Sequence, residues 1–396
     1  MIENRLELLD SWIAGNGYEG YDVYDILSIR VFRLFQKNRY ITFALKMILD
    51  MFPFGFRKLF HVRKRINAKA MALFADSYLN LYKRFDEEKY REKAVFCLNW
   101  LMENPSTGYS GFCWGYPFDW QSRTMIPKNT PSSVVTSISA HAFLDAFEIL
   151  EEPRYLEVAK SCCDFIMQDL NIDRIAEDKL CFSYTPIDTL HVHNANMFCA
   201  SILYRVGALT SDESYIKLAK NAVNYTIREQ NEDGSWYYFG IPEKMQGRID
   251  NYHTGFVLRN LFEVYKITKD AELLKCINKG LEFYTTNLFE NGQIPKFHHN
   301  ISYPIDIHAC AESILCLSKL SEVDPKAIKI AETVATWTIE NMQSREGYFY
   351  YRKYRLFTSK IPYIRWGQAW MLYALSVLTM RLEDAKVLYN KVPYIR

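Results

Sequence analysis

The chain has 396 residues with a formal net charge of +2, and hydrophobic residues make up 49% of it. This share is ordinary for a globular protein, and the length fits two or three domains or one large helical repeat domain. Aromatic residues reach 15%, a content that suits a sugar-binding cleft and equally a large core.

The first distinctive segment, residues 30–69, is both basic and aromatic. It contains eleven Lys and Arg residues but only one acid, Asp50, so it carries a net charge of +10 and the remainder of the chain −8. Phe and Leu residues are interleaved with the basic ones, which is typical of an interfacial segment rather than of nucleic-acid binding. A pair of surface helices packed on the main domain is the simplest interpretation. The alternatives are a peripheral membrane contact through residues 30–69 and a site for an anionic polymer.

Five later segments repeat one amphipathic pattern, with apolar residues at helical spacing and Lys or Glu on the opposite face. They cover residues 88–104, 153–169, 213–229, 271–287 and 325–341. Matched positions, from Tyr90 to Ala327, are separated by 65, 60, 58 and 54 residues. These periods are too long for ordinary solenoid repeats and fit a helical hairpin followed by a substantial loop.

A second type of helix, apolar on most faces, precedes each of these segments and follows the last one. These helices are expected at residues 67–84, 131–150, 190–207, 250–267, 305–321 and 362–380. A helix that is apolar on most faces is a buried one, so the pattern is inner helix, short turn, outer helix and long loop. We therefore predict an all-α fold, an (α/α)6 toroid of helical hairpins over residues 66–396, with an N-terminal helical extension over residues 1–65. Five or seven pairs remain open alternatives, and the sixth outer helix is expected from the first 60 residues or the extreme C-terminus.

Nine cysteines are scattered along the chain without a CxxC spacing. Most lie in apolar helical patterns, where free Cys behaves as a small hydrophobe, and this indicates a reducing compartment. The N-terminus is charged and lacks a signal-peptide core. The sequence contains no run of about 18 uncharged apolar residues, so no transmembrane helix is predicted. We expect a cytoplasmic protein, with the inner face of the membrane as the alternative location.

In a toroid the long loops emerge where the inner helices begin, so polar residues at these helix starts are expected to converge on one cleft. Three of these starts contain an Asp followed closely by a His, and the loop 108–123 adds aromatic and polar residues. An Asp at a helix start is equally well explained as an N-cap. The spacings match no metal-binding motif, and we expect neither a metal nor a cofactor. The candidate catalytic residues are Asp119, Asp250, His253, Asp306, His308 and His193. The candidate substrate-binding residues are Trp114, Tyr116, Trp120, Arg123, Tyr184, Asp188, Asn194, Trp236, Tyr363, Arg365, Trp366 and Gln368.

The hairpin repeat and the stretch "QNEDGSW" (230–236) resemble the α/α-toroid superfamily of six-hairpin glycosidases, triterpene cyclases and related enzymes. The stretches "GYSGFCWGYPFDWQSR", "DGSWYY", "HTGF" and "KIPYIRWGQAWM" further resemble a poorly characterised bacterial and archaeal family from surface-polysaccharide biosynthesis clusters. Some members of that family are labelled δ-aminolevulinate dehydratase, but this sequence lacks that enzyme's alternating βα pattern and its lysine and zinc–cysteine motifs. It also lacks the Asp-rich box that isoprenoid cyclases use, so isoprenoid chemistry is the least favoured interpretation.

The resemblance implies a carbohydrate-active enzyme that acts on a surface polysaccharide or its lipid-linked precursor. Basic residues beside the tyrosines of "GYFYYRKYR" (347–355) suggest that this glycan contains uronate. Hydrolysis would use two carboxylates, with Asp250 and Asp119 as the first candidates. A lyase or C5-epimerase would instead use a Tyr or His to remove a proton while Arg or Asn neutralises the carboxylate. The alternative is a non-catalytic glycan-binding or assembly factor in polysaccharide biosynthesis.

Overall fold

The computed structural model describes residues 2–25, 51–123, 125–242 and 247–391. Its centre is a ring of six inner helices, each packed against the next, and the ring closes because α15 packs against α5. The inner helices are α5 (Ala68–Phe85), α7 (Ser133–Leu150), α9 (His193–Thr210), α11 (Asn251–Thr268), α13 (Ile307–Leu320), and the π-helical η3 (Ile364–Ala369) that continues into α15 (Trp370–Lys391). The predicted all-α toroid is therefore confirmed.

The outer helices each pack on the inner helix that precedes them. They are α6 (Glu88–Glu103), α8 (Pro153–Gln168), α10 (Glu213–Arg228), α12 (Ala271–Asn287) and α14 (Ala327–Met342). Their apolar faces lie in the same core as the inner helices, while their Lys and Glu residues face solvent. Within this core α7 is long and apolar enough to cross a membrane by length and composition alone, yet 67% of that stretch is buried in the ring.

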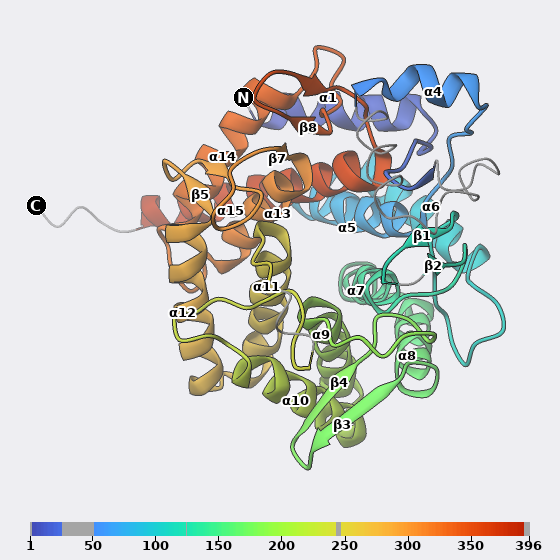
Figure 1. The fold of residues 1–396 in the computed structure, drawn as a ribbon, viewed down its shortest axis with the longest axis vertical. Helices are drawn as coiled ribbons and strands as arrows, with labels where there is room; N and C mark the ends of the chain where they lie inside the picture. Colours follow the sequence, from blue (N-terminus) through green and yellow to red (C-terminus); the bar gives the residue numbers. More distant parts are fainter. Residues whose placement is uncertain (1, 26–50, 124, 243–246, 392–396) are drawn as a thin grey trace, which may run out of the picture.

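Short antiparallel strands lie in the long loops that join the hairpins. Three two-stranded pairs are β1 (Trp120–Gln121) with β2 (Met125–Ile126), β3 (Ile172–Ala176) with β4 (Lys179–Phe182), and β5 (Phe289–Glu290) with β6 (Ile294–Pro295). A three-stranded sheet contains β7 (Ile305–Asp306), β8 (Arg352–Lys353) and β9 (Thr358–Ser359). In Figure 1 the β3–β4 hairpin projects at the lower end of the molecule, and β8 lies beside α1 at the upper end.

The stretch "QNEDGSW" forms the join between α10 and the next hairpin. The side-chain amide of Gln230 donates to the carbonyls of Gly234 and Cys276, both at 3.0 Å, and thereby ties the loop to α12. Gly234 has φ +93°, and a Cβ there would lie 2.3 Å from the carbonyl oxygen of Lys279. Trp236 is buried and its indole donates to the carbonyl of Thr226 at 2.9 Å. The motif therefore joins neighbouring hairpins of the ring.

The same join, repeated after α14, identifies the sixth outer helix as α1 (Ile2–Gly15). Gln343 donates to the carbonyls of Gly347 and Arg5 at 2.8 and 2.9 Å. A Cβ on Gly347 would lie 2.3 Å from the carbonyl oxygen of Leu8. These are the contacts that Gln230 and Gly234 make with α12, so α1 stands in the outer position, where it packs on α15. The first part of the chain thus supplies the missing helix, one of the two sources expected from the sequence.

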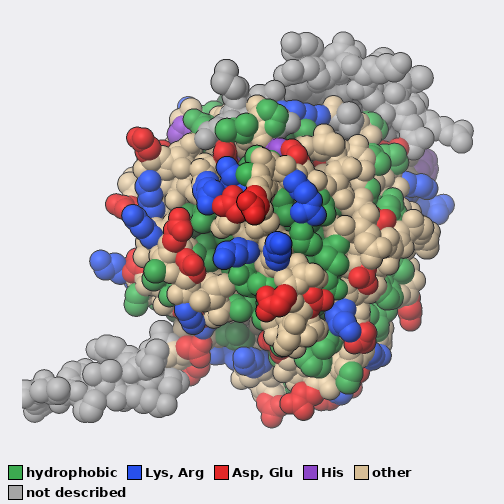
Figure 2. Space-filling model, turned by 90° about the horizontal axis from the view of Figure 1, so that it is seen from below, with side chains coloured by type: hydrophobic (Ala, Val, Ile, Leu, Met, Phe, Trp, Pro, Cys, Tyr) green, Lys and Arg blue, Asp and Glu red, His purple; other side chains and the backbone are tan. Residues whose placement is uncertain are grey.

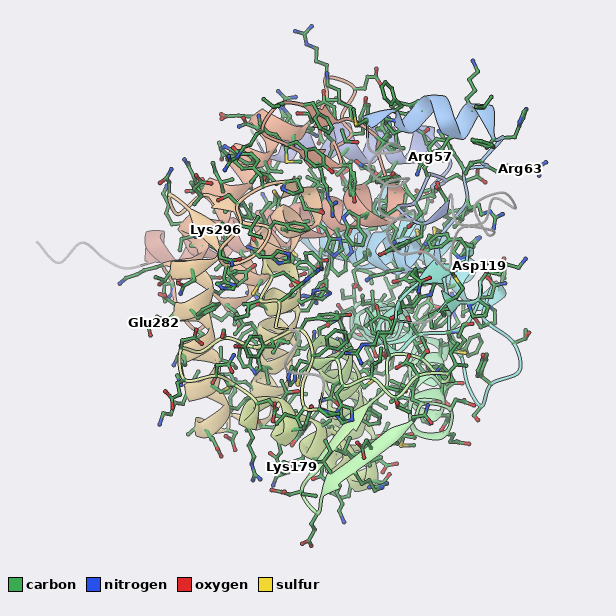
Figure 3. All side chains as sticks on the ribbon, in the orientation of Figure 1. Arg57, Arg63, Asp119, Lys179, Glu282 and Lys296 are labelled. Atoms are coloured by element: carbon green, nitrogen blue, oxygen red, sulfur yellow. The ribbon has the colours of Figure 1, made fainter. Side chains whose placement is uncertain are left out.

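Residues 18–25 also belong to the body of the ring. Asp22 accepts two hydrogen bonds from Arg365 at 2.6 and 2.7 Å, and Asp25 pairs with Arg57 at 2.8 Å. Arg57 belongs to α4 (Pro53–Leu59) and is fully buried, with its side chain directed toward the ring, whereas Arg63 points outward (Figure 3). The predicted boundary at residue 65 stays a prediction, because residues 26–50 lie outside the described part of the chain.

Candidate functional site

A cavity of about 150 Å³ lies where the N-terminal ends of the inner helices meet. Each inner helix contributes a residue from its first turn, and loops complete the wall. The lining residues are Tyr24, Lys69, Tyr116, Trp120, Ser122, Val134, Tyr184, Leu190, Val192, Asn194, Tyr238, Tyr252, His253, Phe256, His308, Arg365 and Trp366. The cavity is therefore mostly aromatic, with a few convergent polar groups, which is the usual character of a small-molecule site.

One wall is aromatic and comes from two long loops. Trp120 contacts Tyr116 and Tyr184, with ring centroids 5.8 and 5.6 Å apart. On the opposite wall Tyr252 lies between two imidazoles, 4.3 Å from His253 and 4.8 Å from His308. Burial raises the pKa of Tyr116, Tyr184 and Tyr252, so their hydroxyls stay protonated at neutral pH. The rings offer faces for stacking on a sugar, and the hydroxyls offer hydrogen bonds.

His253 is held by Asp250, the N-cap of α11. One carboxylate oxygen of Asp250 accepts from the backbone N–H of His253 at 2.9 Å, and the other lies 2.6 Å from its Nδ1. An ionised carboxylate can only accept, so Nδ1 carries the hydrogen and Nε2 is left with a lone pair. The contact with Asp250 fixes the orientation of the ring.

His308, at the start of α13, is oriented by a backbone carbonyl. Its Nδ1 lies 3.0 Å from the carbonyl oxygen of Trp366, which can only accept, so Nδ1 again carries the hydrogen and Nε2 the lone pair. Burial, reinforced by the positive charge of Lys69, holds the pKa of His308 well below its usual range. His308 is therefore neutral at pH 7 and able to act as a base.

Asp306 caps α13 but does not reach the cavity. It is fully buried, and its carboxylate accepts from the His308 backbone N–H, from Arg352 at 2.6 Å and from the Trp366 indole at 2.8 Å. The β7–β8 pairing places Arg352 directly beside it. Asp306 therefore fixes the positions of His308 and Trp366, and it is not among the residues that line the cavity.

Lys69 lies at the floor of the cavity on the first turn of α5. Its ammonium group lies 5.2 Å from the ring centre of Trp370 and 5.9 Å from that of Phe256. Arg365 lies nearby, with Nε and Nη2 donating to Asp22 and the guanidinium 4.5 Å from the Tyr116 ring centre. Among the cavity-lining residues there is no Asp or Glu.

The structure brings eight of the predicted site residues to the cavity wall: Tyr116, Trp120, Tyr184, Asn194, His253, His308, Arg365 and Trp366. Asp250 stands directly behind His253. The other predicted residues do not line the cavity, and most of them have an evident structural part.

Among these, Asp119 accepts from the backbone N–H of Lys128 at 2.9 Å, and Figure 3 shows it on the β1–β2 side of the molecule. Asp188 accepts from the backbone N–H groups of residues 184, 185 and 190 and so fixes its own loop. His193 stacks on Tyr225, with ring centroids 5.5 Å apart, and Arg123 lies over the ring of Phe239.

Four further predicted residues are buried in the frame of the ring. Trp114 donates to the carbonyl of Leu101 at 3.0 Å, as Trp236 does to that of Thr226. Gln368 forms both of its hydrogen bonds with the backbone of Phe349, and Tyr363 accepts from Arg57 at 2.9 Å. These positions do not support a direct contact with substrate.

The main residues that sequence reasoning missed are Lys69, Tyr24, Tyr238 and Tyr252. Lys69 and Tyr252 occupy the first turns of inner helices. A search of every residue in those first turns would have found both. Tyr24 and Tyr238 carry no such signal, because their place depends on how distant loops meet. No group of three or more His, Cys, Asp or Glu side chains in the described ranges is arranged to hold a metal ion.

No protein-family model matches the chain, and no curated protein matches it. Solved structures with the same fold include cellobiose 2-epimerase from Spirochaeta thermophila, with a TM-score of 0.62 and 12% identity over 81% of this chain and 87% of that one. A D-mannose isomerase has a TM-score of 0.60 and 11% identity over 80% and 87%. An unsaturated glucuronyl hydrolase from a Bacillus species has a TM-score of 0.58 and 16% identity over 82% and 89%. At these identities the similarity shows the fold, an α/α toroid, over most of each chain.

Proposed function

We propose that this protein is a carbohydrate-modifying enzyme that moves a proton at a sugar carbon, as an epimerase, isomerase or lyase does. The observation that carries the proposal is the pair of imidazoles in the cavity. Both His253 and His308 have Nδ1 occupied by a fixed acceptor, which leaves Nε2 with a lone pair. Both line one aromatic cavity.

The chemistry begins with a carbon next to a carbonyl or carboxylate group. Nε2 of the neutral His308 takes the proton, and the C–H electron pair forms a new C=C bond while the carbonyl electron pair moves to oxygen. Nε2 of His253, after it has taken a proton from solvent, then gives that proton to the same carbon, where the C=C electron pair forms the C–H bond and the electron pair on oxygen re-forms the carbonyl. In an isomerase the proton goes instead to the former carbonyl carbon, and the hydroxyl on the first carbon passes its proton to the oxyanion and becomes the carbonyl. In a lyase the proton goes to the departing glycosidic oxygen, whose bond to carbon breaks as the oxyanion re-forms the carbonyl, and in each case His308 releases its proton to solvent. Asp250 acts as a positioning residue, since its carboxylate orients His253 and stabilises the imidazolium.

Glycoside hydrolysis is less well supported. It needs two carboxyl groups that face the scissile bond across the substrate. The lining residues include no Asp or Glu, Asp250 lies behind His253, and Asp119 is engaged in its own loop. Cellobiose 2-epimerase and D-mannose isomerase, two of the proteins with this fold, are named for epimerisation and isomerisation, which agrees with proton-transfer chemistry.

Deuterium exchange tests the proposal without requiring the natural product to be known. The protein would be incubated in D2O with a panel of aldoses, ketoses, uronates and oligosaccharides with uronate ends, and exchange at carbon would be followed by NMR. We expect exchange with at least one class, and a loss of about 100-fold or more in His253→Gln and in His308→Gln. His299→Gln, at an exposed loop position, is the matched control and should retain full exchange.

Three outcomes of that experiment would contradict the proposal. The first is no exchange in any class, and the second is sugar binding without exchange, which would favour a glycan-binding or assembly factor. The third is release of new reducing ends without exchange, which would favour hydrolysis.

The wider biological setting also remains a proposal. The surface polysaccharide, its lipid-linked precursor and the cytoplasmic location rest on the sequence resemblance and composition. Of the segment 30–69 proposed to touch a membrane, residues 30–50 lie outside the described part of the chain. In the remainder, Phe52, Phe54 and Leu59 are exposed, which is the feature that supports such a contact.

A further inference from the structure

Lys69 is a buried lysine whose side chain makes no hydrogen bond or ion pair with the described residues. The residue is only 4% exposed, and the two carboxylates that act on it, Glu312 and Asp22, are hydrogen-bonded to Arg259 and Arg365. Two aromatic faces, Trp370 and Phe256, stand beside it instead. A buried charge is normally paired, so this position is costly unless a ligand supplies the partner.

The surroundings of Lys69 favour an anion. Six inner helices point their N-terminal ends toward the cavity, and each end carries a partial positive charge. The pairing of Arg365 with Asp22 uses Nε and Nη2, which leaves Nη1 without a hydrogen-bond partner among the described residues. The lining residues contain no Asp or Glu.

Asn194 provides a second polar group that lacks a partner. It lies on the first turn of α9, lines the cavity and is 3% exposed. Its side-chain oxygen makes no hydrogen bond with any residue that the structure describes. A buried amide oxygen of this kind usually meets a donor on a ligand, such as a sugar hydroxyl.

We propose that Lys69 and Arg365 form a subsite for an anionic group of the substrate, so that the enzyme acts on a charged saccharide such as a uronate. This inference rests on the proposed function, whose cavity it shares. A carboxylate or a phosphate on the sugar would pair with the Lys69 ammonium, while Asn194 accepts a hydrogen bond from a hydroxyl group. A neutral sugar would leave the lysine unpaired.

Binding of an anion should be linked to uptake of a proton. Burial, reinforced by the positive charges of Arg365 and Arg259, holds the pKa of Lys69 well below its usual range in the empty cavity. An anion at the subsite would raise that pKa, and Lys69 would take a proton from the buffer. The charged and titratable groups that face Lys69 from the surrounding elements are Arg365, Arg259, Glu312, Asp22 and His308.

Isothermal titration calorimetry tests the subsite with three probes: D-glucuronate, D-glucose 6-phosphate and D-glucose. We expect at least one charged sugar to bind about tenfold or more tightly than glucose, because a charge-assisted contact is stronger than a neutral one. The stronger of the two charged probes identifies carboxylate or phosphate as the preferred group. Lys69→Met should abolish the preference, and Lys275→Met, at an exposed position on α12, should retain it.

Repeating the wild-type titration in buffers of different ionisation enthalpy measures proton uptake, which does not depend on any variant folding. We expect uptake of up to one proton for each charged sugar bound and none with glucose. Equal binding of charged and neutral sugars, absence of binding by both charged probes, or an unchanged preference in Lys69→Met would overturn the subsite. Deuterium exchange on neutral sugars alone would overturn the subsite but not the proposed function. A preference for charged sugars without deuterium exchange on any sugar would overturn the proposed function but not the subsite.

Discussion

Asp250 and Asp306 begin neighbouring inner helices in the same way, yet they serve different purposes. Both accept from a backbone N–H of the following turn, as the sequence predicted for an N-cap. Asp250 also holds the ring of His253, whereas Asp306 is used by Arg352 and Trp366. The sequence could not separate them, because Arg352 is 46 residues away and arrives through the pairing of β7 with β8.

Lys69 shows a second limit of residue-level prediction. It is the last residue of the basic segment 30–69. A count of charges therefore placed it among residues that were expected at a surface. Its burial follows from its place on the first turn of an inner helix, so the helix pattern was the better guide to its environment than the local charge.

Asp76, in the middle of α5, gives a prediction about pH. It is 3% exposed, and burial together with the negative charge of Asp145 holds the pKa of its carboxyl well above the usual range. The native state therefore keeps a proton that the unfolded state loses above about pH 4. This contribution to stability is complete below that pH and is lost as the pH rises toward the native pKa.

Asp76→Asn should remove this pH-dependent contribution to the free energy of unfolding, since the amide cannot ionise. Urea unfolding of both proteins at pH 5 and pH 8 would measure it. We expect the stability of the variant, relative to that of the wild type, to be greater at pH 8 than at pH 5. Parallel stabilities at both pH values would show that Asp76 does not contribute to the pH dependence.

At the scale of elements, helices were more predictable than the segments between them. Residues 131–150 and 250–267 were expected as inner helices, and α7 and α11 begin within two residues of those starts. The β3–β4 hairpin was not expected, because β3 is mostly exposed and carries little apolar alternation. The part of the cavity wall that the loops form, which includes Tyr238, was therefore not predictable from the sequence. The neighbours of Tyr238 come from other hairpins.

The glycine of the inter-hairpin join gives an element-scale prediction. Gly234 combines a positive φ with a carbonyl only 2.3 Å from where a Cβ would stand, whereas Gly292 has φ +68° and open space around it. Gly292→Ala should cost roughly 1–2 kcal/mol of strain alone. Gly234→Ala adds a clash with the α12 backbone. It should lower the free energy of unfolding by roughly 2 kcal/mol more than the control variant Gly292→Ala does. Urea unfolding midpoints would compare the two, and equal losses would show that the α10–α12 join is not tightly packed.

At the scale of the whole molecule, the ring is a repeat closed by the two parts of the chain that are farthest apart in sequence. The number of hairpins followed from the periodic pattern, but the identity of the closing helix did not. The reason is that α1 lies outside the periodic pattern, whose first helix was expected at residues 67–84. The face in Figure 2 shows Lys and Arg side chains intermixed with Asp and Glu near its centre.

Closure by α1 predicts that two adjacent leucines differ sharply in importance. Leu9 is fully buried in the core shared with α15, while Leu8 is 40% exposed on the same turn. Leu9→Ala should lower the free energy of unfolding by roughly 2–5 kcal/mol, because it leaves a cavity at the point where the ring closes. Leu8→Ala should change it by about 0.5 kcal/mol or less. If urea unfolding gave the same small loss for both, α1 would be a dispensable appendage and five outer helices would suffice. A large loss at Leu9 alone would show that the contact of α1 with α15, which joins two distant parts of the chain, contributes to the stability of the ring.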